Sequence, residues 1–313
     1  MERRLEGEVA VVAGGTRGAG RGISVELGAA GATVYVTGRS TRDGRSPMER
    51  PETIEETAQM VAASGGQGIP VRVDHSDRAQ VQALFDRIEE EQSGRLDVLV
   101  NDIWGGDPLV KWDTPFWEHS LDDGLSLLRQ AVETHVITSH YAAPLMVRHK
   151  RGLILEITDG TGADYRGNLF YDLAKASVIR LALAQAEELR HHNVTALALT
   201  PGFLRSEAVL DHFGVSEENW RDAIEHDPYF VASETPSYIG QAVVALATDP
   251  NVLRRTGEAV STWQLAKEYG FTDRDGGQPD WESHFLEHVQ NVPRSQIPGL
   301  RHLSDHGDSW TGW

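Results

Sequence analysis

Short apolar runs alternate with amphipathic stretches along most of the chain. Runs rich in β-branched residues predict strands at 9–13, 33–37, 69–73, 97–100, 153–157, 195–199 and 258–261. Between them, apolar residues recur three or four positions apart and predict helices at 21–30, from 51, and at 77–91, 126–148, 171–190 and 238–247. Strands that alternate with helices are typical of parallel pairing with right-handed crossovers. The pattern therefore predicts an α/β fold with a doubly wound parallel sheet of about seven strands.

A glycine-rich turn, Gly14-Gly15-Thr16-Arg17-Gly18-Ala19-Gly20, joins the first predicted strand to the first predicted helix. Glycines let the backbone approach a pyrophosphate, and the N–H groups at the start of a helix bind its negative charge. The spacing G-x-x-x-G-x-G differs from the G-x-G-x-x-G fingerprint, and a tight turn without a ligand is the alternative interpretation. The strand-turn-helix context favours a nucleotide site.

Composition excludes several classes of protein. The 313 residues include 47 Asp and Glu against 29 Lys and Arg, which gives a net charge of −18 and argues against a nucleic-acid partner. No run reaches the 18 apolar residues of a membrane span, and no signal-peptide core precedes the first strand. The absence of cysteine excludes disulfides and cysteine nucleophiles. These features favour a cytoplasmic protein without a membrane partner.

A second motif, Y-x-x-x-K, lies where the helix after the fifth predicted strand begins. Tyr171 and Lys175 share one face of that helix, one turn apart. A nearby ammonium is expected to lower the pKa of the phenol and make it a usable acid or base. Because the motif is short, a surface tyrosine packed on a lysine stem is the alternative interpretation.

Taken together, these motifs carry a resemblance to a known family. Over residues 7–262 the chain resembles the short-chain dehydrogenases/reductases, and within them the subgroup of dehydrogenase/reductase member one and its bacterial relatives. The family pattern TGxxxGxG corresponds to Ala13–Gly20, with alanine for threonine. The other motifs correspond to Asp74, the stretch from Asn101 to Gly105, Tyr171 with Lys175, Pro201-Gly202 and Ser206.

The resemblance implies a Rossmann-type domain over residues 1–263 and hydride transfer between a nicotinamide and a carbonyl or alcohol. Tyr171 would be the general acid/base, Lys175 would assist it and bind the ribose, and the protein would be a homodimer or homotetramer. The implied cofactor contacts are Gly14, Thr16, Arg17, Gly18, Ala19, Arg39, Ser40, Asp74, His75, Asn101, Tyr171, Lys175, Pro201, Gly202, Phe203 and Ser206.

Arginines near the end of the second predicted strand bear on the choice of cofactor. NAD-specific enzymes usually place an acid there, whereas this chain has Gly38-Arg39-Ser40-Thr41-Arg42, with Arg17 in the glycine turn. Arginine suits the 2′-phosphate of NADP(H). We therefore expect NADP(H) as cofactor.

The chain departs from the family pattern at two positions. The family serine, which hydrogen-bonds the substrate oxygen, would fall at Thr158 or Asp159, and the strand phase favours Asp159. A carboxylate cannot donate to an oxyanion. The family asparagine would fall near Gln130 or Ala131, with His135 as a conceivable substitute. The alternatives are therefore a catalytically impaired NADP-binding sensor or scaffold, or a non-redox reaction with Asp159 as base.

Two regions are expected to hold the small carbonyl or alcohol substrate. Residues 103–121 follow the fourth strand, and residues 203–234, here called the lid segment, follow the sixth. The candidate pocket residues are Trp104, Phe116, Trp117 and Phe213. Residues 264–313 are expected to pack on the domain or on a neighbouring subunit through Trp281, Trp310 and Trp313. His284 and His288 match H-x-x-E-H without a third ligand, so no metal site is expected.

Overall fold

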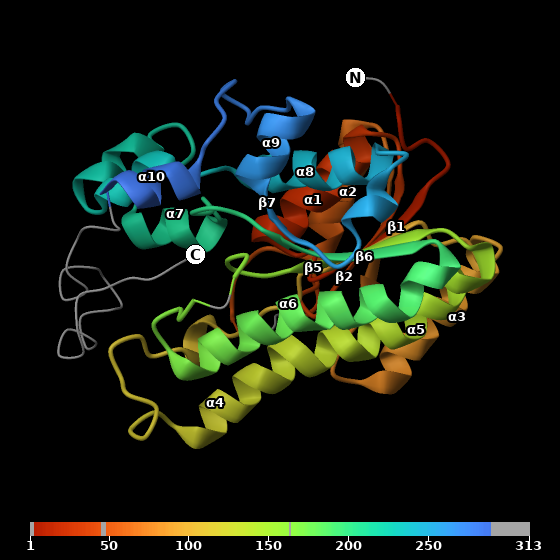
Figure 1. Cartoon of the computed structure of the whole chain (residues 1–313), viewed down its shortest axis with the longest axis horizontal. Coiled ribbons are helices and arrows are strands. Elements are labelled where there is room, and N and C mark those ends of the chain that lie inside the picture. Colours follow the sequence, from red (N-terminus) through yellow and green to blue (C-terminus); the bar gives the residue numbers. More distant parts are fainter. Residues whose placement is uncertain (1–2, 45–47, 163, 289–313) are drawn as a thin grey trace.

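The computed structural model describes residues 3–44, 48–162 and 164–288. Within these ranges seven parallel strands form one sheet in the order β3-β2-β1-β4-β5-β6-β7 (Figure 1). The strands are β1 (Val9–Ala13), β2 (Thr33–Gly38), β3 (Gln67–Arg72), β4 (Val98–Asn101), β5 (Gly152–Ile157), β6 (Val194–Thr200) and β7 (Ala259–Ser261). The predicted doubly wound sheet is confirmed. Its strand order reverses between β1 and β4, and sheets of this kind bind ligands at the carboxyl ends there.

Helices cover both faces of the sheet (Figure 1). One layer contains α1 (Gly18–Ala29), α2 (Ile54–Ser64) and α8 (Pro236–Thr248), and the opposite layer contains α3 (Arg78–Glu91), α5 (Thr134–His149) and α6 (Leu169–Leu189). The shorter helices are α4 (Leu121–Leu128), α7 (Glu207–Phe213), α9 (Thr262–Tyr269) and α10 (Trp281–His288).

The core explains why the strand runs are apolar on both sides. Along β1, Ala10 and Val12 pack toward the layer of α1, α2 and α8, whereas Val9 and Val11 pack toward α3, α5 and α6. Because side chains alternate along a strand, a strand covered on both faces needs apolar residues at every position. Burying one such side chain contributes about 1.5–3 kcal/mol, which holds the strand ends in register.

The helix expected at 126–148 is divided in the structure. It begins earlier, as α4, passes through a π-helical segment Arg129–Glu133 and continues as α5. Ser120 caps α4 by accepting a hydrogen bond from Asp123 N at 3.2 Å. Apolar spacing runs through the π-helical segment without interruption, so the sequence pattern did not show it. Such segments often lie at functional sites, and Gln130 lines the pocket described below.

The lid segment folds as a small lobe at one end of the sheet. Around Trp220 and Phe230 it forms a hydrophobic cluster of its own, which includes Phe213. Helix α10 lies beside α7 in this lobe (Figure 1), and Trp281 packs edge-on against Phe203 at a centroid distance of 5.9 Å. Trp310 and Trp313 lie outside the described residues. None of the helices in the described ranges has the length and apolar character to cross a membrane.

Candidate active site

A pocket of about 640 Å³ opens at the carboxyl ends of the strands. The turn after β1, the end of β2, the segment after β4, the start of α6 and the lid segment all contribute to its wall. Most of the residues predicted from sequence line it, namely Gly14, Thr16, Arg17, Gly18, Ala19, Arg39, Ser40, Asp74, His75, Trp104, Thr158, Asp159, Tyr171, Lys175, Pro201, Gly202, Phe203 and Ser206. The structure therefore brings together motifs that are far apart in the sequence.

The glycine turn is held against the end of β2. Gly14 N and Gly15 N both donate to the Thr37 carbonyl, at 3.1 and 2.9 Å. Gly14 has a φ of +90°, and a Cβ there would lie 2.2 Å from the carbonyl oxygen of Asp102. A larger residue at this position would therefore separate β1 from the segment after β4.

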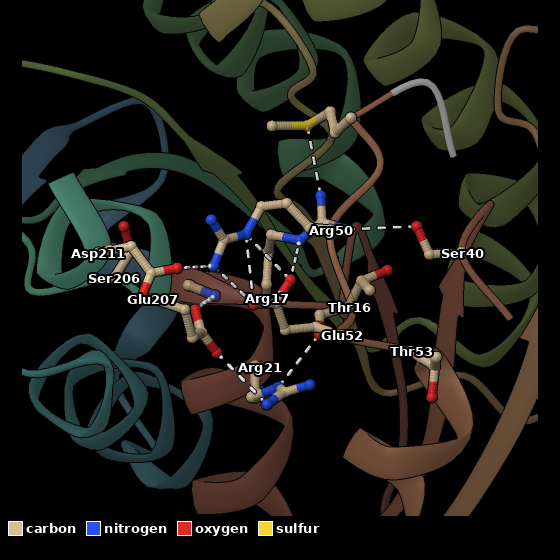
Figure 2. A network of polar contacts seen from close by, with 12 residues as sticks. Thr16, Arg17, Arg21, Ser40, Arg50, Glu52, Thr53, Ser206, Glu207 and Asp211 are labelled. Carbon is tan, nitrogen blue, oxygen red and sulfur yellow. Dashed lines mark hydrogen bonds and ion pairs between the residues drawn. The ribbon is translucent and has the colours of Figure 1, made fainter. Parts of the chain in front are cut away.

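The N-terminus of α1 receives its acceptor from the lid. Arg17 is the N-cap residue and makes no side-chain capping bond, and no acid lies in the first turn of α1. Instead Gly18 N donates to Glu207 Oε2 at 2.7 Å (Figure 2). This helix end thus already binds a carboxylate, so its charge and donors suit an anion.

Arginines and one buried acid surround the end of β2 (Figure 2). Arg17 donates to Glu52 at 3.1 Å and to Ser40 Oγ at 3.2 Å. Arg50, which sequence reasoning did not single out, donates to the same Glu52 at 2.7 Å. Arg39 lies 4.0 Å from Asp74 and keeps about a third of its side chain exposed. Arg17 and Arg50 thus share one carboxylate at this corner.

Tyr171 lies in the first turn of α6 and faces a carboxylate. Asn168 Oδ1 caps the helix by accepting from Phe170 N and Tyr171 N at 3.0 and 3.1 Å. The Tyr171 hydroxyl donates to Asp159 Oδ2 at 2.8 Å, whereas the Thr158 hydroxyl turns away and donates to the Lys175 carbonyl at 2.9 Å. Of the two candidates for the serine position, Asp159 is therefore the one aimed at Tyr171.

Burial and Asp159 together hold the pKa of Tyr171 well above its ordinary value. Burial is the largest cause, and the charge and hydrogen bond of Asp159 act in the same direction. This corrects the expectation that Lys175 lowers the pKa of the phenol. The Lys175 ammonium lies 5.6 Å from the Tyr171 ring centroid and only 4.2 Å from that of Trp104.

Lys175 is surrounded by acids and an indole. Burial lowers its pKa, while the charges of Asp159, Asp102 and Asp107 act against burial. Burial also raises the pKa of Asp102 to about 7, which Lys175 counteracts. Trp104 packs edge-on against Tyr171 at 5.6 Å between centroids. Trp104 thus lines the pocket, as expected, and its ring also contacts the Lys175 ammonium.

Behind the pocket wall, a buried acid joins β4, β5 and α5. Glu156 accepts from Asn101 Nδ2 at 3.0 Å and lies 2.7 Å from His135 Nδ1, while His135 Nε2 lies 3.2 Å from the Ile103 carbonyl. Asn101 is fully buried and is not among the residues that line the pocket. His135 ties α5 to the segment after β4, and the Gln130 side chain lies instead 3.4 Å from Arg39.

Three predicted pocket residues lie elsewhere. Phe116 and Trp117 pack on each other, are 53% and 71% exposed, and do not line the pocket. Phe213 packs on Phe230 inside the lid lobe. Trp281 and Tyr229 line the pocket in their place. Aromatic content alone could not separate these groups, because the choice depends on how the loops fold back.

The fold and the pocket define a dinucleotide-binding α/β protein, and sequence comparison gives its family. The family model for short chain dehydrogenases matches residues 8–212. The chain therefore belongs to the short-chain dehydrogenase/reductase family, whose members are oxidoreductases that bind a nicotinamide cofactor and act on small molecules.

Among its relatives are dehydrogenase/reductase SDR family member 1 of mouse and human, at 38% and 37% identity. Each alignment covers 88% of this chain and 86% of the relative, which confirms the expected subgroup. The 3-oxoacyl-[acyl-carrier-protein] reductase FabG of Aquifex aeolicus is 27% identical over 78% of this chain and 97% of its own.

Solved structures show the same fold. A short chain dehydrogenase from Mycobacterium thermoresistibile superposes with a TM-score of 0.73 at 24% identity, over 89% of this chain and 92% of its own. A metagenomic short-chain oxidoreductase in complex with NADP superposes with a TM-score of 0.60 at 24% identity, over 79% of this chain and 93% of its own.

Proposed function

We propose that this protein is an NADP(H)-dependent oxidoreductase that interconverts a carbonyl and an alcohol by hydride transfer. The observation that carries the proposal is that the Tyr171 hydroxyl lines the same pocket as Lys175 and the N-terminus of α1, which has no capping side chain of its own. A phenol that can donate a proton thus shares one cavity with an anion site and with room for a dinucleotide.

The residues around the pocket fit such a cofactor. The α1 N-terminus would hold the pyrophosphate, because Gly18 N already donates to a carboxylate there. Lys175 would bind the ribose, and Pro201, Gly202 and Ser206 would face the nicotinamide, as in the family. When bound, the nicotinamide supplies or accepts the hydride.

The NADP(H) preference rests on the corner formed by Arg17, Arg39 and Ser40. Arg17 reaches Ser40 Oγ at 3.2 Å, and Arg39 lines the same part of the pocket. Guanidinium groups bind phosphate oxygens through two parallel hydrogen bonds. A 2′-phosphate at the end of β2 would therefore be bound by charge and by geometry.

Tyr171 and Asp159 give the proton a defined route. In the reductive direction the Tyr171 proton would move to the developing alkoxide, and Asp159, protonated from solvent, would return a proton to the phenolate oxygen. In the oxidative direction Tyr171 takes the alcohol proton while its own proton passes to Asp159 Oδ2, 2.8 Å away. Asp159 thus serves as a proton acceptor where the family has a hydroxyl donor.

Cofactor titration tests the proposal first. Measured by nicotinamide fluorescence, NADPH is expected to bind more tightly than NADH. Arg39→Ala should weaken NADPH binding by about 1–2 kcal/mol, because a charge-assisted contact is removed. Arg42→Ala is the matched control, since Arg42 is exposed and does not line the pocket.

The outcomes separate the parts of the proposal. Preference for NADH would contradict the arginine argument and leave the fold unaffected. Binding of neither nucleotide would contradict the cofactor site itself.

The alternative, nucleotide binding without turnover, is less well supported, because the matching family model and relatives are those of oxidoreductases. A carboxylate faces Tyr171, and the nearest hydroxyl, that of Thr158, is engaged by Lys175 O. Asp159→Ser tests this alternative against a panel of carbonyl substrates. Turnover by wild type supports the enzyme, whereas turnover that appears only in the serine variant supports a sensor or scaffold.

A further inference from the structure

The lid helix α7 is tied to the cofactor side of the pocket by two carboxylates (Figure 2). Glu207 accepts from Gly18 N at 2.7 Å and lies 3.4 Å from Arg21. One turn further along, Asp211 pairs with Arg50 at 2.7 Å. These contacts join α7, which follows β6, to α1 and to the segment before α2.

Glu207 supplies what α1 lacks. The first N–H groups of a helix need acceptors, and the positive end of the helix dipole attracts an anion. Among the residues of its own turn, α1 has neither a capping side chain nor an acid. Its acceptor comes from a residue 189 positions further along the chain.

We propose that Glu207 competes with the cofactor pyrophosphate for the N-terminus of α1, and that a bound nucleotide must displace Glu207 and move α7. The inference rests on the proposed function, which places a dinucleotide at this turn. Gly18 has a single N–H, so the carboxylate and a phosphate oxygen cannot both receive it. Two anions at the same helix end would also repel each other.

Asp211 extends this competition to the second anionic group of NADP(H). Arg50, its partner, also donates to Glu52, and Glu52 accepts from Arg17 at the expected 2′-phosphate corner. A phosphate beside Arg17 would attract Arg50 and weaken its pair with Asp211. The two lid carboxylates thus correspond to the two anionic groups of the cofactor. Movement of α7 breaks the Asp211 pair with either nucleotide, and the 2′-phosphate of NADP(H) weakens that pair in addition.

This correspondence gives a two-by-two test with NADPH and NADH as the probes. We expect Glu207→Gln to lower the Kd of both nucleotides about three- to tenfold, because the amide competes without a charge. Asp211→Asn should lower the Kd of NADPH about two- to fivefold and that of NADH by a smaller factor, because only NADPH also weakens the pair through its 2′-phosphate. Glu218→Gln is the control, since Glu218 is an exposed acid of the same lid segment outside the pocket.

Association kinetics provide a second readout on the wild-type protein. If Glu207 must leave first, the observed rate of NADPH binding levels off at high concentration. In Glu207→Gln the limiting observed rate should be higher, or the observed rate should increase linearly with NADPH concentration. A linear dependence in wild type overturns the inference even if the variant fails to fold.

The failures are distinguishable. Unchanged or weaker binding by Glu207→Gln, with NADPH bound by wild type, overturns the competition and leaves the proposed function standing. No binding of either nucleotide by wild type or variants overturns the proposed function, and this inference with it.

Discussion

At the scale of single residues, the hydrogen bond between Tyr171 and Asp159 sets the chemistry of the pocket. It keeps the phenol protonated, since a negative acceptor 2.8 Å away opposes loss of the proton. The strand phase favoured Asp159 over Thr158 for the family serine position, and Asp159 is the one of the two that contacts the Tyr171 hydroxyl. The direction of the Tyr171 pKa shift depends on burial, which a motif cannot show.

Removal of the phenol hydroxyl should abolish turnover and spare cofactor binding. We expect Tyr171→Phe to lower kcat about 10²- to 10⁴-fold, because the general acid/base is lost. The Kd for NADPH should stay within about twofold of wild type. Tyr165→Phe is the matched control, as Tyr165 is half exposed and outside the pocket. Equal kcat in Tyr171→Phe and wild type would contradict the mechanism.

The pH dependence of the reaction should change when the acid is neutralised. Asp159 raises the pKa of Tyr171, second only to burial, so Asp159→Asn should lower it. In the reductive direction, activity requires the protonated phenol and falls as pH rises through that pKa. The alkaline limb of the pH–rate profile should therefore move to lower pH in Asp159→Asn. An alkaline limb in the same place would show that Asp159 does not act on Tyr171.

At the scale of elements, Glu234 joins the loop after β6, the end of the lid segment and α9. Its Oε2 accepts from Gly202 N at 2.9 Å and from Thr262 Oγ1 at 2.7 Å. Burial raises the pKa of Glu234 to about 8, so the folded protein holds a proton that the unfolded chain has already released above pH 4.5. Stability from this group is complete below pH 4.5 and is lost as pH rises to about 8.

Glu234→Gln should reduce the dependence of the free energy of unfolding on pH between about 4.5 and 8. Because the amide stays neutral, the free energy of unfolding at pH 8.5 should be higher in the variant than in wild type by roughly 2 to 5 kcal/mol. Denaturant unfolding at this pH measures the difference. Part of the slope will persist, since burial also raises the pKa of Asp102 to about 7. Glu225→Gln, an exposed acid of the lid segment, should keep the wild-type slope. The same slope in Glu234→Gln would show that Glu234 is ionised in the folded protein.

Elements with a strong local pattern could be predicted from the sequence, and contacts between elements could not. Every strand was found within about two residues, because short apolar runs stood out between the amphipathic stretches, including the partly exposed edge strand β3. The π-helical segment Arg129–Glu133 was missed, since apolar spacing is the same on either side of it. Half of the residues that line the pocket followed from the motifs and the resemblance, whereas the contacts of Glu207 with Gly18 and of Asp211 with Arg50 depend on how α7 packs in three dimensions.

At the scale of the whole molecule, apolar side chains on α4 and α6 point to self-association. Leu121 and Leu125 on α4 are 64% and 42% exposed, and Leu173 on α6 is 46% exposed. The two helices lie side by side (Figure 1). Exposed apolar residues gathered on neighbouring helices are typical of interfaces. With the family resemblance, they support a homodimer or homotetramer.

Negative charges introduced on the exposed face of α4 should weaken the association of subunits. We expect wild type to sediment as a dimer or tetramer and the double variant Leu121→Glu/Leu125→Glu to sediment at a lower mass. Met60→Glu on α2 is the control, because Met60 is also exposed but lies on the opposite layer. Low salt should favour dissociation, since copies with a net charge of −18 repel each other. A monomeric wild type would contradict the prediction.

The contact between Gly18 and Glu207 also has a consequence for biosynthesis. A ribosome adds about 5 to 20 residues per second, so the 189 positions between these residues correspond to roughly 10 to 40 s of translation. During that time the first helix of the nascent chain emerges with its leading amide groups lacking the partner that the finished protein provides. This end of the helix therefore gains its acceptor only after about two thirds of the chain has been made.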